Sequence, residues 1–268
     1  MDAPARLVLL GHPVSHSISP RFQNAALRAA GIALEYQTLD VSPAHLADTM
    51  AMLGRERAAG NATIPHKEAL AALCTRLSPL AQRVGAVNTW WHEDGELVGD
   101  NSDVGGAAMV MRAFLRRHDD GARVTVLGAG GSAASVICAA ERCGVSQVRV
   151  FNRNSERAAH LVARFPDIAR VAESVADAMN GSALVINATP VGLHEGDGFP
   201  IPLNVLPPDC GVFDLCYRAN ETEWVRAARE AGHHAADGEG MLLEQGAIAF
   251  ERWFGVPPDR GVMWKSLH

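Results

Sequence analysis

The chain has 268 residues, of which 48% are hydrophobic and 20% charged, and it carries 24 Lys and Arg against 30 Asp and Glu. This composition is typical of folded globular proteins, and the formal net charge of −6 leaves no basic surplus for a nucleic-acid partner. No run reaches the roughly 18 apolar residues of a membrane span, and the apolar stretch near the start is too short for a signal peptide, so we expect a cytoplasmic protein with no membrane partner.

The cysteines and histidines do not form the patterns of disulfide-rich or metal-binding proteins. The five cysteines are an odd number without a Cys-x-x-Cys pair, and none of the eleven histidines lies in a His-Glu-x-x-His arrangement. We therefore expect neither a disulfide framework nor a metal site. The cysteines are Cys74, Cys138, Cys143, Cys210 and Cys216.

The first hundred residues predict a separate α/β unit. The apolar run of residues 7–10 has the length and composition of a buried strand. Three Ser-Pro pairs predict helix starts, because a serine hydroxyl can cap a helix that has proline at its first position. These pairs are Ser19-Pro20, Ser42-Pro43 and Ser78-Pro79. Gly31 is expected to end the first of these helices.

A β-hairpin is predicted over residues 88–99. The turn sequence Glu93-Asp94-Gly95 separates two apolar pairs, Trp90-Trp91 and Leu97-Val98. Asp-Gly is a favoured two-residue turn between antiparallel strands. We expect this hairpin to lie at the edge of the first unit's sheet.

Between residues 124 and 238, short apolar runs alternate with stretches of helical periodicity. Continuous apolar strands separated by helices are typical of a parallel sheet covered on both faces, so this block is predicted to be one α/β domain. The runs are residues 124–127, 148–151, 184–186 and 212–215. Gly232 is expected to end a helix, and a further helix over residues 241–254 is expected to pack back on the first unit.

A glycine-rich turn follows the strand of residues 124–127 and opens a helix rich in small residues. Such a turn can hold a dinucleotide, because Gly128 allows a tight turn, Gly130 lets backbone N–H groups approach a phosphate, and the helix N-terminus adds positive potential. The residues of this candidate site are Gly128, Ala129, Gly130, Gly131 and Ser132. The pattern also occurs in ordinary strand-to-helix turns, so the residues after the next strand are the stronger evidence for or against a dinucleotide site.

That next strand is followed by Asn152, Arg153 and Arg157, where an NAD site would present an acidic side chain to the ribose hydroxyls. A guanidinium can bind a 2′-phosphate through two hydrogen bonds, so the sequence predicts NADP rather than NAD as the cofactor. In the alternative, Asn154 or Ser155 caps a surface helix and Arg157 is a solvated side chain.

Several short motifs occur in one order along nearly the whole chain. They are the glycine turn, His16-Ser17-Ile18-Ser19-Pro20, Asn61-Ala62-Thr63-Ile64-Pro65-His66-Lys67-Glu68, Gly85-Ala86-Val87-Asn88-Thr89, Gly99-Asp100-Asn101-Ser102-Asp103, Asn187-Ala188-Thr189-Pro190 and Met241-Leu242-Leu243-Glu244-Gln245. With these motifs the chain resembles the shikimate dehydrogenase family. The resemblance implies reversible NADPH-dependent reduction of 3-dehydroshikimate to shikimate. It also implies a substrate-binding domain of residues 1–104 plus 239–268 and a Rossmann-like NADP-binding domain of residues 105–238.

The resemblance also implies roles for single residues and a small-molecule substrate bound by a monomer or homodimer. Lys67 and Asp103 match the catalytic pair of the family. The residues that would face the substrate carboxylate are Ser17, Ser19 and Tyr217, and those that would bond the ring hydroxyls are Thr63, Asn88 and Gln245. The further residues that would contact the cofactor are Asn187, Ala188, Thr189 and Gly238.

Each of these roles has a simpler structural alternative. Lys67 would be an exposed lysine at a helix start, and Asp103 would be the N-cap of the helix that follows. Ser19 would be used as a helix cap, Tyr217 would pack beside the apolar strand before it, and Gln245 would be a surface amide.

Two other functions remain open from the sequence. One is a relative in the same family that oxidises quinate or another polyhydroxy ring acid with NAD or NADP, and the other is a non-catalytic nucleotide-binding regulator. Relatives that accept quinate often carry threonine at the second of two matching positions, so the resemblance with serine at both Ser17 and Ser19 implies shikimate rather than quinate. Retention of Lys67 and Asp103 argues against a regulator. Val104 stands where the family has glycine, and since a β-branched residue excludes positive φ, it predicts a changed backbone at this point.

Overall fold

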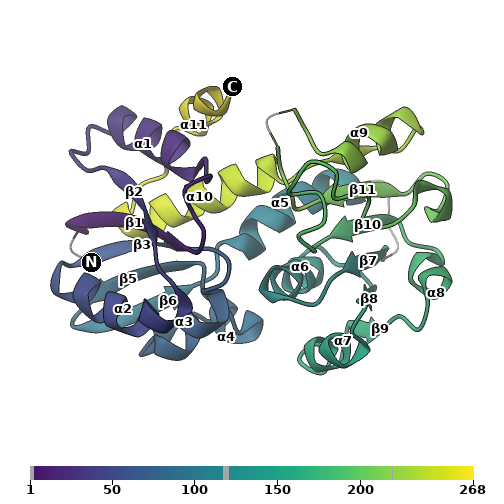
Figure 1. Ribbon diagram of the computed structural model, residues 1–268, viewed down its shortest axis with the longest axis horizontal. Coiled ribbons are helices and arrows are strands. Elements are labelled where there is room, and N and C mark those ends of the chain that lie inside the picture. The colour runs from purple at the N-terminus through teal and green to yellow at the C-terminus, as the bar shows by residue number, and fades with distance from the viewer. Residues whose placement is uncertain (1–2, 117–120, 219) are drawn as a thin grey trace. The chain divides into compact units, whose positions relative to one another are not determined.

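The computed structural model describes residues 3–116, 121–218 and 220–268. The chain divides into two compact units, one made of Met1–Gly106 with Leu242–His268 and the other of Ala107–Met241 (Figure 1). Each unit contains a six-stranded sheet and helices, so the predicted α/β class is confirmed. Among the described residues, no helix is both long and apolar enough to cross a membrane.

The first unit contains both ends of the chain. Its strands are β1 (Arg6–Gly11), β2 (Tyr36–Asp40), β3 (Ala58–Ala62), β4 (Arg76–Leu77), β5 (Thr89–Glu93) and β6 (Glu96–Asp100). Its helices are α1 (Ser19–Ala29), α2 (Leu46–Arg55), α3 (Lys67–Leu73), α4 (Pro79–Val84) and α11 (Arg260–Leu267), with a 3-10 turn at Pro43–His45. Two helices, α5 (Asp103–Leu115) and α10 (Glu239–Phe254), form the connections to the second unit.

The sheet of the first unit is mixed, in the order β2-β1-β3-β5-β6-β4. Strand β1 is parallel to β2 and β3, whereas β5 is antiparallel to β3 and β6, so β6 runs in the direction of β1 and β3. The predicted hairpin is confirmed as β5–β6, with Asp94 and Gly95 of its turn at φ 53° and 80°. Its predicted place at the sheet edge is wrong, because the short strand β4 pairs with β6 and takes that edge.

The three Ser-Pro pairs behave differently. Ser78 caps α4 as predicted, since its Oγ accepts a hydrogen bond from the Ala81 amide at 3.1 Å. The capping prediction for Ser19 is wrong, because the preceding Ile18 already has helical backbone angles and Ser19 lies inside the first turn of α1. That for Ser42 is wrong as well, because its hydroxyl bonds His45 Nδ1 at 2.8 Å instead of a backbone amide.

Alternate residues of β1 pack on opposite faces of this sheet, as the two-residue period of a strand requires. Leu7 and Leu9 belong to a core that also contains Phe22 of α1 and Phe250 of α10. On the other face, Val8 and Leu10 belong to a core formed with α2 and α3. The helix predicted over residues 241–254 therefore packs on the first unit, as expected. Gly31, at φ 67°, follows the end of α1.

The second unit has the strand order of a dinucleotide-binding fold. Its strands are β7 (Arg123–Leu127), β8 (Gln147–Phe151), β9 (Ala169–Val171), β10 (Leu184–Asn187), β11 (Gly211–Asp214) and β12 (Ala235–Ala236). Its other helices are α6 (Gly131–Arg142), α7 (Ser155–Val162), α8 (Val175–Met179) and α9 (Glu223–Glu230), with a 3-10 turn at Leu203–Val205. The pairings are parallel in the order β12-β11-β10-β7-β8-β9, which is the Rossmann order with its topological switch point between β7 and β10.

Both faces of this second sheet are covered. Val212 of β11 packs in a core with Trp224 of α9 and Met179 of α8. Its neighbour Phe213 points to the other face, where its ring stacks on Phe114 of α5 with 6.4 Å between the centroids. The predicted parallel, doubly covered sheet is confirmed. Gly232, at φ 93°, follows the end of α9 as expected.

Candidate active site

The first unit brings five candidate residues to one edge of its sheet. Ser17 follows β1, Thr63 and Lys67 follow β3, and Asp103 follows β6. Because β1, β3 and β6 run in the same direction, their carboxyl ends lie at one edge. Asn88 directly precedes β5, which runs in the opposite direction, so it lies at the same edge. In α/β proteins this edge is the usual place of a ligand site.

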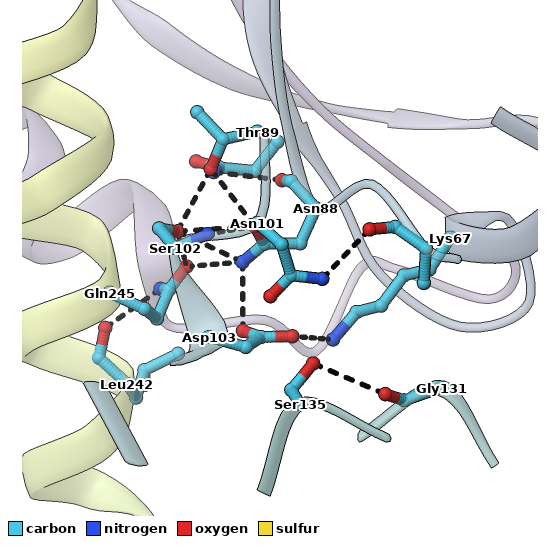
Figure 2. A network of polar contacts seen from close by, with 12 residues as sticks. Lys67, Asn88, Thr89, Asn101, Ser102, Asp103, Gly131, Ser135, Leu242 and Gln245 are labelled. Carbon is cyan, nitrogen blue, oxygen red and sulfur yellow. Dashed lines mark hydrogen bonds and ion pairs between the residues drawn. The ribbon is translucent and has the colours of Figure 1, made fainter. Parts of the chain in front are cut away.

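Lys67 and Asp103 form an ion pair with little exposure to solvent. Lys67 Nζ donates to Asp103 Oδ2 at 2.6 Å, and the two side chains are 16% and 7% exposed (Figure 2). Lys67 begins α3, but it is not the exposed lysine of the structural alternative. Asp103 begins α5, and its second oxygen, Oδ1, accepts from Asn88 Nδ2 at 2.8 Å. Its two oxygens therefore bind side chains and hold the lysine in place.

Asn88 is held at both ends of its amide. Its Nδ2 lies 2.8 Å from Asp103 Oδ1, 3.0 Å from Ser102 Oγ and 3.2 Å from Gln245 Oε1. Its Oδ1 accepts from the Ser102 amide at 2.7 Å, which fixes the amide with its nitrogen toward Asp103. An amide nitrogen has two hydrogens, so three acceptors within reach compete for them.

Gln245 is part of this network and not a surface amide. It lies on α10, is 8% exposed, and donates from Nε2 to the Leu242 carbonyl at 2.7 Å. Its Oε1 faces Asn88 Nδ2 (Figure 2). A residue from the last part of the chain thus joins residues from the first hundred in one site.

Behind the pair lies a second layer of buried polar residues, for which the sequence motifs predict no role. Thr89 Oγ1 lies 2.8 Å from Ser102 Oγ and accepts from Asn61 Nδ2 at 3.1 Å. Asn61 also donates to the Asn88 carbonyl at 3.0 Å and accepts from Tyr36 Oη at 2.8 Å. Burial raises the pKa of Tyr36 well above its usual value, so it remains a donor. In the sequence, these residues are marked only by being polar within or beside the short motifs that contain Asn61 and Thr89.

Val104 does not distort the site. It is the second residue of α5, fully buried, with a helical backbone in which valine is unstrained. This chain therefore does not need positive φ at this position, and a difference from the backbone of the family stays a prediction.

Three other candidates of this unit stand apart from the network. Ser17 Oγ accepts from the Ser19 amide at 3.3 Å. Thr63 follows β3, its amide donating to the Leu10 carbonyl at 2.8 Å. Among the described residues, the hydroxyls of Ser19 and Thr63 form no hydrogen bond, so neither is consumed by the fold. The position of Ser19 at the start of α1 adds the positive end of a helix.

In the second unit, the glycine turn has the shape that a pyrophosphate needs. Gly128 has φ 107°, and a Cβ built on it would lie 2.9 Å from the Ala188 carbonyl oxygen, so only glycine fits. Gly130 is the N-cap of α6, and a Cβ there would meet nothing within 4 Å. Ala129, Gly131 and Ser132 complete a half-exposed turn at the N-terminus of this twelve-residue helix. The open space and the helix terminus fit a dinucleotide.

The arginines after β8 are exposed. Within the described part of the chain, neither Arg153 nor Arg157 forms an ion pair. Asn154 caps α7 by accepting from the Arg157 amide at 3.0 Å, as the structural alternative supposed, and Asn152 Nδ2 donates to the Asn154 carbonyl at 2.8 Å. The cap uses the backbone of Arg157, so its guanidinium remains available to a phosphate.

The turn after β10 lies beside the glycine turn at the switch point. The Ala188 amide donates to the Leu127 carbonyl at 2.8 Å. Asn187 is buried, and its Oδ1 accepts from both the amide and the hydroxyl of Thr189, at 3.0 and 2.6 Å. Gly238 packs so closely on the segment after β11 that a Cβ would lie 2.2 Å from the Leu215 carbonyl oxygen.

Tyr217 lies three residues after β11 and is half-buried. It belongs to the second unit, whereas the other candidates for binding the substrate belong to the first.

Three family profiles match successive parts of the chain. "Shikimate dehydrogenase substrate binding domain" matches residues 9–90, "Shikimate / quinate 5-dehydrogenase" residues 113–192, and "Shikimate 5'-dehydrogenase C-terminal domain" residues 238–268. A shikimate dehydrogenase (NADP(+)) of Rubrobacter xylanophilus is 41% identical over 279 residues, covering 100% of this chain and 97% of that protein. The chain belongs to the shikimate dehydrogenase family.

Solved structures of the shikimate dehydrogenase family have the same fold. Shikimate 5-dehydrogenase from Thermus thermophilus, in complex with NADP(H) and shikimate, is 35% identical, with a TM-score of 0.85 and 98% of each chain covered. Quinate dehydrogenase from Corynebacterium glutamicum, in complex with NAD, is 28% identical, with a TM-score of 0.87 and 99% of each chain covered. The fold of this shikimate dehydrogenase family member is therefore shared by proteins named for different ring acids.

Proposed function

We propose that the protein catalyses the reversible NADPH-dependent reduction of 3-dehydroshikimate to shikimate. The observation that carries this proposal is the Lys67–Asp103 pair, which the Asn88 amide holds at the ligand-binding edge of the first sheet. Relatives named as NADP-dependent shikimate dehydrogenases at 38 to 41% identity over nearly the whole chain support it. The first unit would be the substrate-binding domain and the second the NADP-binding domain.

Lys67 is the proton donor in this proposal. Reduction of a ketone leaves negative charge on its oxygen, and an ammonium group within hydrogen-bond reach neutralises it by giving up a proton. In the reverse direction the neutral amine takes the proton from the hydroxyl. Asp103 holds Lys67 Nζ at 2.6 Å and thereby fixes the direction from which the proton is delivered.

The second unit would hold NADP. When bound, the nicotinamide accepts or supplies the hydride. The glycine turn at Gly128 and Gly130 would bind the pyrophosphate, Arg153 and Arg157 the 2′-phosphate, and the turn after β10 would lie along the nicotinamide half. The further residues of this proposed site are Ala129, Gly131, Ser132, Asn152, Asn187, Ala188, Thr189 and Gly238.

The substrate would be bound by neutral polar groups. Ser17, Ser19 and Tyr217 would face the carboxylate, helped by the positive end of α1. Thr63, Asn88 and Gln245 would bond the ring hydroxyls. We propose a cytoplasmic monomer or homodimer, a location in keeping with five cysteines that are all free thiols.

The test is removal of the proton donor. Lys67→Ala is expected to lower kcat for shikimate oxidation with NADP by about 10² to 10⁴. Its dissociation constant for NADPH, measured by calorimetry without substrate, is expected to stay at the wild-type value. A variant that keeps most of its kcat would exclude this role for Lys67.

A second candidate function is oxidation of quinate with NAD, because a quinate dehydrogenase with bound NAD shares the fold at a TM-score of 0.87. The serines at positions 17 and 19 and the absence of an acidic residue among Asn152, Arg153 and Asn154 favour shikimate and NADP. A non-catalytic regulator is not favoured, since the Lys67–Asp103 pair is retained with its supporting hydrogen bonds.

A further inference from the structure

Asp214 is a buried carboxylate to which the proposed reaction assigns no role. It is the last residue of β11 and has no solvent exposure. Its Oδ1 accepts from Asn187 Nδ2 at 2.8 Å and from the Cys216 amide at 3.0 Å, and its Oδ2 accepts from Thr222 Oγ1 at 2.8 Å. A carboxylate so placed is tolerated only because its oxygens are hydrogen-bonded.

The first of these bonds acts on the turn after β10. With its Nδ2 bound to Asp214, Asn187 must present Oδ1 to the amide and hydroxyl of Thr189. The same Nδ2 also donates to the Val191 carbonyl at 2.9 Å, and the Val191 amide donates to Thr189 Oγ1 at 3.2 Å. A carboxylate accepts hydrogen bonds only, so it excludes the flipped orientation of the Asn187 amide.

The other bonds act on the segment after β11. The Cys216 amide, which Asp214 binds, directly precedes Tyr217. The Cys216 thiol donates to the Thr189 carbonyl at 3.4 Å, so this segment and the turn after β10 are also in contact. Thr222 caps α9 by accepting from the Val225 amide at 3.4 Å while it donates to Asp214. One carboxylate thus fixes the ends of two neighbouring strands and the start of a helix.

We propose that Asp214 is a positioning residue for nucleotide binding, which holds the turn of residues 187–191 in the shape that receives the nicotinamide half of NADP. This inference rests on the proposed function. Asp214 would act through Asn187 and not by contact with cofactor or substrate. If Asp214 has this role, substitutions at Asp214 weaken binding of the cofactor even where the second unit remains folded.

The test compares four variants by calorimetric titration with NADPH in the absence of substrate, together with kcat and KM. Asp214→Ala is expected to raise the dissociation constant for NADPH about tenfold or more, because the Asn187 amide loses its charged partner. Asp214→Asn, which keeps an acceptor oxygen for Asn187 and Cys216, is expected to restore binding to within about threefold. Thr222→Val, which keeps Asp214 but removes its Oδ2 partner, is expected to lie between them, and Thr222→Ser to resemble the wild type.

A matched control separates positioning from general loss of stability. Ser174→Ala removes a hydroxyl cap of the same kind, from α8 in the same unit, where Ser174 Oγ accepts from the Asp177 amide at 3.1 Å. It is expected to lower the melting temperature without changing the dissociation constant for NADPH. Because Asp214 acts through Asn187, the double variant Asp214→Ala with Asn187→Ala is expected to bind NADPH no more weakly than the weaker-binding of the two single variants, Asp214→Ala and Asn187→Ala.

The inference is overturned if Asp214→Ala and Thr222→Val lower only the melting temperature, as Ser174→Ala does, and leave NADPH binding unchanged. That result would leave the proposed function intact, since the wild type would still bind NADPH and oxidise shikimate. A wild-type protein that binds no NADPH would instead refute the proposed function, and with it this role for Asp214.

Discussion

Asp103 is the residue on which the geometry of the proposed active site depends. Its two oxygens bind Lys67 and Asn88, at 2.6 and 2.8 Å, so it links the proposed proton donor to an amide proposed to bind the substrate ring. Substitution by asparagine would replace one of these acceptors by an amide nitrogen and remove the charge that holds the ammonium group.

We therefore expect Asp103→Asn to lower kcat about tenfold or more, while the double variant with Lys67→Ala should be hardly worse than Lys67→Ala alone. Steady-state rates of shikimate oxidation measure both effects. Glu68→Gln, which removes the exposed carboxylate next to Lys67, is the matched control and should retain the wild-type kcat. Losses that multiply in the double variant would show that the two residues act independently.

The exposed guanidinium of Arg153 is expected to set the choice of cofactor. A charge-assisted hydrogen bond to the 2′-phosphate contributes about 1.5 to 3 kcal/mol, so Arg153→Ala should weaken NADP binding roughly 10- to 150-fold and leave NAD binding nearly unchanged. Calorimetric titration with each nucleotide measures the difference. Arg142→Ala, at the other end of α6, serves as the control. If Arg153→Ala weakened the binding of NADP and of NAD equally, Arg153 would support the fold and not the choice of cofactor.

Asp214 is expected to shape the dependence of stability on pH. Burial raises the pKa of Asp214 to about 6, against the opposing hydrogen bonds from Thr222, Cys216 and Asn187. The Cys216 thiol also interacts with Asp214, and burial raises the pKa of this thiol as well. Because the folded-state pKa of Asp214 lies above its ordinary value of 3.8, the native state binds the proton more tightly. The stabilisation is complete below about pH 3.8 and is lost as pH rises through about 6.

Asp214→Asn removes this titration. The free energy of unfolding of the variant minus that of the wild type should therefore rise by about 2 to 3 kcal/mol between pH 4 and pH 7. Urea unfolding of both proteins at several pH values gives this difference, in which the other titrating groups cancel. Parallel curves for the two proteins would mean that Asp214 does not titrate in this range.

At the scale of elements, identical Ser-Pro pairs take different roles because of what surrounds them. Ser78 caps α4 and also donates to the buried Asp100, whereas the Ser42 hydroxyl bonds the exposed His45 and, among the residues that the structure describes, no other side chain or amide. Ser78→Ala is therefore expected to lower the free energy of unfolding by about 1 to 3 kcal/mol, and Ser42→Ala by less than about 0.5 kcal/mol. Urea unfolding measures both. Equal effects would show that the tertiary contact of Ser78 adds nothing to its cap.

The sequence predicted the elements that carry strong local signals. The apolar strand runs, the Asp94-Gly95 turn and the glycine after α1 all specify their structure through residues close in sequence. The strands β2, β3, β4, β9 and β12 were not predicted. Three of them, β4, β9 and β12, have only two or three residues, which are too few to show a period, and they form by pairing with a distant neighbour. The place of the hairpin inside the sheet depended on one of them.

The candidate site shows the same contrast between residues that local motifs identify and residues whose role depends on distant contacts. The motifs identified Lys67, Asp103 and Asn88, and the structure shows that Asp103 is hydrogen-bonded to both Lys67 and Asn88. Asn61 and Thr89 stood within the motifs but had no assigned role, because their importance lies in contacts behind the site that only the packed sheet creates. Asp214 was not predicted for the same reason, since its contact with Asn187 joins the ends of two different strands of the second unit.

At the scale of the whole molecule, the residues of the proposed function are divided between the two units. The first carries the Lys67–Asp103 pair and the serines at positions 17 and 19, and the second carries the glycine turn and Arg153. Solved structures with this fold are named for shikimate and for quinate and contain NADP(H) or NAD, so both the substrate and the cofactor differ among these similar proteins. Substrate and cofactor must therefore be tested together.

The most direct measurement is kcat/KM for shikimate and for quinate, each with NADP and with NAD, followed by the absorbance of the reduced cofactor. Quinate carries an extra hydroxyl at the carbon that bears the carboxylate, and an unpaired buried hydroxyl costs about 1 to 3 kcal/mol. We therefore expect shikimate with NADP to be the best pair, by roughly 5- to 150-fold over quinate with NADP. Comparable values for the two acids, or a higher value for quinate with NAD, would contradict the proposed function.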